Sequence, residues 1–161
     1  MEAIQPIFQQ TSHALKAIRC QSDWRLRHLC LNERFNGHQQ LGQTVFPLVW
    51  HVVQNQFSNA VIESIEHRVN LVHVDPSLSM QANRAFIVQA LGRLANRREI
   101  WAPICSNHTY LLHCLGRVLD DWEDDSLNQL ILVYVGDHGN ESAFAQLAER
   151  AGMRFCFQAL L

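Results

Sequence analysis

The sequence predicts an α/β fold, in which three N-terminal helices lead into a small, mostly parallel sheet with helices on both faces. Over residues 1–67, apolar side chains recur every three or four positions, which is typical of amphipathic helices. Short β-rich runs then alternate with helical stretches over residues 68–161 in the order βαβαβαβ. Such alternation implies parallel strands joined by right-handed crossovers. No linker separates the two parts, so we expect residues 1–161 to form a single domain.

The first two helices are predicted from apolar spacing and capping residues. Residues 4–18 place their apolar side chains on one helical face. A short second helix is predicted over residues 22–30, with Ser22 as its N-terminal cap. The composition of residues 36–43, which include two glycines, predicts a loop before the third helix.

The third helix has the clearest amphipathic pattern. Thr44 can cap it, and Pro47 falls in its first turn, where a missing N–H costs nothing. Apolar side chains repeat at three and four from residue 46 to residue 65, and we expect this stripe to cover the sheet. Its aromatic content also suits a partner groove, so three residues are candidates for partner binding: Phe46, Trp50 and Phe57.

The sheet is expected to come from residues 68–161. Strands are predicted at 69–74, 99–105, 130–135 and 154–160, with helices at 79–96, 108–122 and 140–151 between them. The run at 130–135 is apolar throughout, which is typical of a central strand buried on both faces. Pro103 favours a position near a sheet edge or a strand end, and Gly152 suits the end of the last helix.

Polar side chains follow three successive predicted strands. They are Asp75, Ser77 and Ser79 after the first strand, Ser106, Asn107 and His108 after the second, and Asp137, His138, Asn140 and Glu141 after the third. The carboxyl ends of parallel strands meet at one edge of a sheet, where ligands bind in open α/β folds. The same residue types cap helices in any strand-to-helix turn. Both a ligand-binding cleft and simple capping therefore remain open.

This arrangement loosely resembles the haloacid dehalogenase-type phosphatases, through Asp75, Ser106, Asp137 and Glu141. The resemblance implies that Asp75 is the nucleophile, that Ser106 holds phosphate, and that Asp137 with Glu141 holds Mg²⁺. The chain departs from that family at Ser77, which stands where the family has its general acid aspartate. It also lacks the family's late lysine and one strand–helix unit.

An aspartate and then a serine at successive strand ends, Asp75 and Ser106, also resemble the central half of a response-regulator receiver. The acidic pair that this family carries on its first strand is absent, and so is the lysine on its last strand. Lys16 is the only lysine of the chain, and the other twelve of its 13 basic residues are arginines. Since both resemblances require a late lysine, its absence favours binding over catalysis or phosphorylation.

Metal or thiol chemistry is a third hypothesis. Cys105 and His108, followed by His113 and Cys114, have side chains that can bind zinc, and Cys105 with His108 could form a nucleophile pair. However, Cys114 falls on the apolar face of its predicted helix, and Cys105 ends a buried strand. Both thiols are therefore expected in the core.

Composition limits the classes of function. Of the 161 residues, 48% are hydrophobic and 17% charged, which predicts one packed core rather than disorder. The net charge of −2 argues against nucleic-acid binding. No apolar stretch is long enough to span a membrane, no signal peptide is evident, and the five cysteines are irregularly spaced. We therefore expect a cytoplasmic protein that does not bind membranes.

These observations favour a non-catalytic regulatory or adaptor protein that binds another protein or a second copy of itself. Two charged clusters add candidates for partner binding: Trp122, which lies within an acidic run, and the basic residues Arg97 and Arg98. The alternative is a small enzyme, a phosphoryl hydrolase or transferase, that uses Asp75, Ser106 and Asp137 at the strand ends. No cofactor is expected for the binding function, and Mg²⁺ is expected only for the enzyme.

Overall fold

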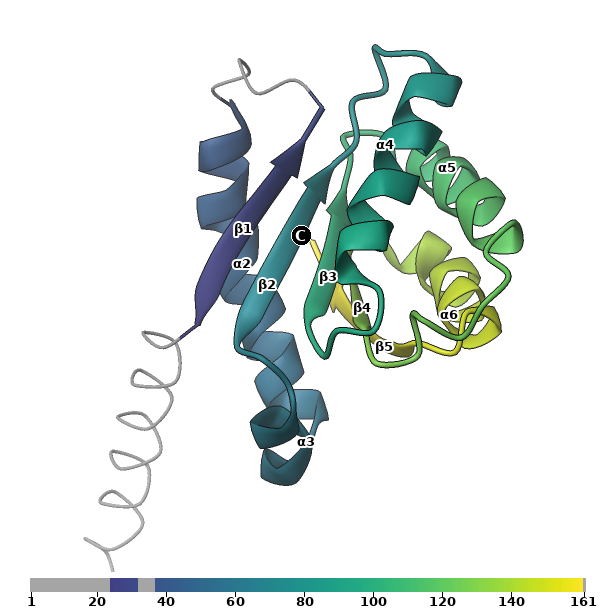
Figure 1. The fold of residues 1–161 in the computed structure, drawn as a ribbon. Coiled ribbons are helices and arrows are strands. Elements are labelled where there is room, and N and C mark those ends of the chain that lie inside the picture. The colour runs from purple at the N-terminus through teal and green to yellow at the C-terminus, as the bar shows by residue number, and fades with distance from the viewer. Residues whose placement is uncertain (1–23, 32–36, 161) are drawn as a thin grey trace, which may run out of the picture.

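The structure is a computed structural model that describes residues 24–31 and 37–160. It is an α/β fold around five parallel strands, which lie side by side in sequential order (Figure 1). The strands are β1 (Arg25–Cys30), β2 (Arg68–His73), β3 (Ile100–Ile104), β4 (Ile131–Gly136) and β5 (Arg154–Ala159). The helices are α2 (Gly37–Gln56), α3 (Asn59–Ser64), α4 (Met80–Leu94), α5 (His108–Asp120), the 3-10 turn η1 (His138–Asn140) and α6 (Glu141–Arg150).

The prediction of three N-terminal helices is wrong, because the first described element is a strand. Where a helix was predicted over residues 22–30, β1 pairs with β2 in parallel. Leu26 packs in the core on one face of the sheet and Leu29 in the core on the other. This use of both faces, together with the ladder of backbone hydrogen bonds, is what a strand requires. The helix predicted at residues 4–18 lies outside the described residues.

Helix α2 also differs from its predicted bounds. It begins at Gly37, within the predicted loop, and it continues through Pro47 to Gln56. The predicted single helix up to residue 65 is interrupted, because Ser58 caps the separate helix α3 by accepting a hydrogen bond from Val61 N at 3.3 Å. The apolar stripe nevertheless packs on the sheet, as expected from its spacing.

The later elements match their predictions closely. Ser79 caps α4 and Asn107 caps α5, and the chain after α6 turns at Gly152 with a φ of 76°. Pro103 lies near the end of the central strand β3, which agrees with the strand-end alternative, and not at a sheet edge. The pairing of β3 with β4 ends at Trp101, so Pro103 falls beyond the paired part of that side and interrupts no ladder hydrogen bond there.

The helices form two layers, with α4, α5 and α6 on one face of the sheet and α2 with α3 on the other (Figure 1). All four crossovers step in the same direction across the sheet. The crossover through α2 therefore has the opposite hand to the three that follow, and those three, for which one common hand was expected, agree with one another. Both faces of β2 and β4 are buried, so both need a covering layer. Within the described chain, no helix is long and apolar enough to cross a membrane.

Candidate functional site

The loop after β2 is closed by its own hydrogen bonds. The backbone N–H and the hydroxyl of Ser77 both donate to Asp75 Oδ1, at 2.9 and 2.6 Å. Ser79 Oγ accepts from Ala82 N at 3.1 Å and so caps α4. The buried amide of Asn83 donates to the backbone oxygen of Asp75 at 2.7 Å and holds the loop against the start of α4.

The loops after β3 and β4 are closed in the same way. Asn107 Oδ1 accepts from Tyr110 N at 3.0 Å. Asp137 Oδ1 accepts from the backbone and side-chain nitrogens of Asn140, at 3.1 and 2.9 Å. The phenol oxygen of Tyr134 accepts from Asp137 N at 3.2 Å. Three of the predicted site residues, Ser79, Asn107 and Asp137, therefore act as helix caps.

The remaining predicted residues of this edge differ in exposure and in contacts. Ser106 and His138 are exposed, and the His138 ring lies 5.0 Å from that of Phe157. His108 is half-buried and contacts Tyr134 edge-on, with ring centroids 5.7 Å apart. Glu141 is the first residue of α6 and is half-buried. The catalytic roles proposed for Asp75, Ser106 and Asp137 stay predictions.

The cysteines and histidines considered for metal or thiol chemistry lie in different surroundings. Cys114 is buried in the core, where its thiol lies 3.0 Å from the sulfur of Met80, whereas His113 is exposed between α5 and α6. Burial raises the pKa of the Cys105 and Cys114 thiols, which keeps them protonated at neutral pH. No three metal-binding side chains come together among the residues that the structure describes.

The aromatic residues of α2, and Phe57 directly after it, contribute to the core beneath the sheet. Trp50 is only 9% exposed, and Phe46 and Phe57 pack against the same cluster while half-buried. The guanidinium of Arg154 lies 6.0 Å from the centre of the Phe57 ring. Partner binding by these three aromatic residues stays a prediction, and their packing leaves little of Trp50 for a partner.

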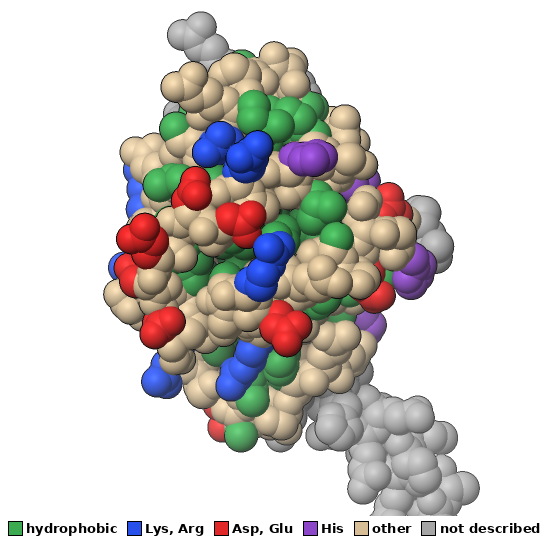
Figure 2. All heavy atoms as spheres, turned by 90° about the vertical axis from the view of Figure 1, so that its right-hand side faces the viewer, with side chains coloured by type: hydrophobic (Ala, Val, Ile, Leu, Met, Phe, Trp, Pro, Cys, Tyr) green, Lys and Arg blue, Asp and Glu red, His purple; other side chains and the backbone are tan. Residues whose placement is uncertain are grey.

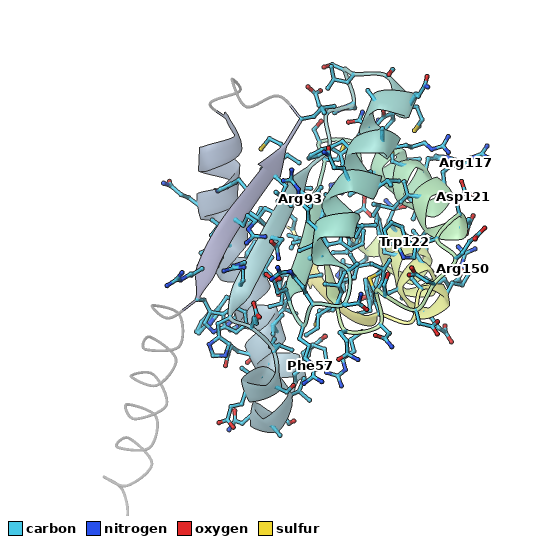
Figure 3. The ribbon with its side chains drawn as sticks, viewed as in Figure 1. Phe57, Arg93, Arg117, Asp121, Trp122 and Arg150 are labelled. Atoms are coloured by element: carbon cyan, nitrogen blue, oxygen red, sulfur yellow. The ribbon has the colours of Figure 1, made fainter. Side chains whose placement is uncertain are left out.

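A surface groove lies between α4 and α5, on the opposite layer. It has a volume of about 690 Å³ and is lined by Gln81, Arg84, Ala85, Val88, Val118, Asp121 and Trp122. Val88 is 47% exposed, which is high for an apolar side chain. The carboxylate of Asp121 lies 3.8 Å from the guanidinium of Arg84 and links the two helices across the groove. Figure 3 shows Asp121 and Trp122 at the same end of the molecule.

Trp122 is fixed at the end of this groove by the acidic run that follows it. Its indole N–H donates to Asp124 Oδ1 at 2.9 Å and to Ser126 Oγ at 3.1 Å. The N–H and the hydroxyl of Ser126 also donate to Asp124 Oδ1, and these hydrogen bonds lower the pKa of that carboxyl. Trp122 also lines a second hollow, with Glu123, Asp124 and Asp125. The acidic run is therefore a turn that presents a tryptophan between two hollows.

The face around α5 and α6 is charged with both signs. Figure 2 shows acidic and basic side chains interspersed over it, with hydrophobic side chains between them. Arg150 of α6 forms an ion pair with Asp120 of α5 at 3.1 Å, beside a hollow of about 260 Å³. The α4–α5 groove differs from this hollow by its size and its exposed valine.

The two arginines predicted to bind a partner lie at the opposite, amino-terminal edge of the sheet. Arg97 pairs with the fully buried carboxylate of Glu99 at 3.6 Å, while Arg98 lines a polar cavity. Partner binding by Arg97 and Arg98 stays a prediction, as it does for Trp122.

Comparison with known proteins gives no functional assignment for these surfaces. Comparison of the chain with protein families, with curated proteins and with solved structures found no match. Sequence reasoning selected Trp122 but missed Val88 and Arg84. A signal for Val88 was present, because it lies outside the apolar stripe of α4 formed by Ile87, Leu91 and Leu94.

Proposed function

We propose that the protein is a non-catalytic adaptor or regulatory protein, which binds a helix of another protein in the groove between α4 and α5. The observation that carries this proposal is the groove itself, in which exposed Val88 and half-buried Trp122 share one hollow. A groove between two helices suits an amphipathic helix that inserts its apolar side chains. Tryptophan is also among the residues that most often dominate binding energy at interfaces.

The charges around Trp122 favour a basic partner. Glu123, Asp124 and Asp125 are exposed beside the groove, and Asp121 is 78% exposed. The contact between Asp121 and Arg84 is a solvent-exposed ion pair, and such pairs contribute only about 0–1 kcal/mol. A lysine or arginine of the partner can therefore replace Arg84 at Asp121 at low cost.

The strand-end loops give additional support to a non-catalytic function. Asp75 and Asp137 each use a carboxylate oxygen to close their own loop. Such loop-closing hydrogen bonds are those that aspartates form in ordinary strand-to-helix turns, and they need no catalytic role. The phosphoryl-transfer alternative has no comparable supporting observation.

A selection from a library of displayed helical peptides tests the proposal. The full chain is used as bait, and peptides that also bind the Val88→Asp variant are removed by counter-selection. We expect the enriched peptides to combine one apolar face with basic residues. Enrichment of acidic peptides, or the loss of every selected peptide once binders of the variant are removed, would exclude the groove as the docking site.

A further inference from the structure

A polar cavity of about 240 Å³ lies at the amino-terminal edge of the sheet, away from the α4–α5 groove. It is lined by Ser64, Ile65, Arg98, Asn128, Gln129 and Arg154. Two of these side chains are guanidinium groups and two are amides, and none is a carboxylate. The lining therefore offers several hydrogen-bond donors and two positive charges to one small volume.

Backbone hydrogen bonds hold the segments around this cavity in place. Glu66 N donates to Arg98 O at 2.7 Å, which joins the end of α3 to the segment before β3. Ile131 N donates to Glu99 O at 3.1 Å, and Arg154 N donates to Leu130 O at 3.3 Å. The backbone at Arg98, at Leu130 and at Arg154 is thus tied to one edge of the sheet. The cation–π contact with Phe57 further orients Arg154, near the position of Phe57 in Figure 3.

At this edge of the sheet, some arginines form ion pairs and others do not. The buried carboxylate of Glu99 is already engaged by Arg68 at 3.5 Å and by Arg97 at 3.6 Å. Within the described part of the chain, neither Arg98 nor Arg154 forms an ion pair. Two guanidinium groups that line one cavity without a carboxylate between them repel each other, and a bound anion relieves that repulsion.

We propose that this cavity binds a phosphate group, held by Arg98 and Arg154 with the amides of Asn128 and Gln129 as further donors. Arginine is suited to this task because its planar fork donates two parallel hydrogen bonds to phosphate oxygens. The group can be free phosphate or the phosphate of a small phosphorylated molecule. This proposal is independent of the docking groove, since the two sites share no lining residue.

Calorimetric titration of the full chain with inorganic phosphate and with a sugar phosphate tests this site, at constant ionic strength set with chloride. We expect saturable binding of at least one of them. Loss of one charge-assisted contact in Arg98→Gln or Arg154→Gln should weaken it about tenfold or more. Arg117→Gln, which removes the same charge from the exposed surface of α5, serves as the matched control and should bind as the wild type does.

The relative affinities identify the source of the phosphate group. Tighter binding of the sugar phosphate assigns the site to a phosphorylated small molecule, and equal binding assigns it to free phosphate. Melting curves in chloride alone verify that the variants are folded. The proposal is overturned if neither ligand binds, or if Arg117→Gln weakens binding as much as the other variants.

Discussion

Gly42 of α2 lies against the imidazole of His28 in β1, so close that a β-carbon at position 42 would overlap the ring. The His28 ring is held in turn by His73 of β2, whose Nε2 lies 3.1 Å from His28 Nδ1. The two rings are stacked, with centroids 5.4 Å apart. A glycine thus lets α2 approach the carboxyl ends of the first two strands closely.

Replacing this glycine is expected to destabilise the protein, although alanine is the better helix former. Gly42→Ala should cost about 1–3 kcal/mol, because His28 must leave its contact with His73. Gly92→Ala is the matched control, since it is helical and nothing lies within 4 Å of its added β-carbon. It should stabilise the protein by about 1 kcal/mol. Urea unfolding measures both, and stabilisation by both variants would contradict the close contact.

Because Glu99 is buried, removing one of its arginine partners is predicted to destabilise the protein more than neutralising Glu99 itself. Arg68→Ala leaves the buried carboxylate with Arg97 as the one ion-pair partner that the described residues supply, so we expect a loss of about 2 kcal/mol or more. Glu99→Gln should cost less, because an amide can still accept from Asn70 Nδ2 and the two arginines are partly exposed to water. Urea unfolding at neutral pH compares the variants. A larger loss for Glu99→Gln would show that the charge itself stabilises this edge.

The turn that holds Trp122 predicts a change in the titration of Asp124. Hydrogen bonds from Ser126 lower the pKa of this carboxyl in the folded protein. The stability that they contribute is present above the unfolded-state pKa and is lost as the pH falls through the folded-state pKa. Ser126→Ala should raise the pKa of Asp124, as measured by NMR of its carboxyl carbon, and Ser142→Ala in α6 should not. An unchanged value in Ser126→Ala would argue against this turn.

Strand–helix alternation was sufficient to predict the second half of the fold. Helices α4 and α5 begin at caps that can be recognised in the sequence, Ser79 and Asn107. The first half could not be predicted in the same way. Gly42 is used for close packing rather than for a turn, and β1 is a strand only because it pairs with β2. Such tertiary contacts override local propensity.

The strand-end residues could be predicted as a group, but their role could not. Asp137 and Asn107 have the same local sequence signal whether they cap a helix or bind a ligand. The hydrogen bonds to Asn140 and Tyr110 distinguish the two cases only in three dimensions. The α4–α5 groove depends on how two helices pack, so its combination of Val88 with Trp122 is not visible in the sequence.

The affinity of a selected basic helix for two variants of α4 tests the proposed docking most directly. Val88→Asp places a charge in the groove, whereas Gln89→Asp places the same charge on the next exposed residue, outside the groove lining. We predict that Val88→Asp weakens binding about tenfold or more, and that Gln89→Asp changes it by no more than about twofold. Equal affinities for the two variants, both folded, would contradict the account.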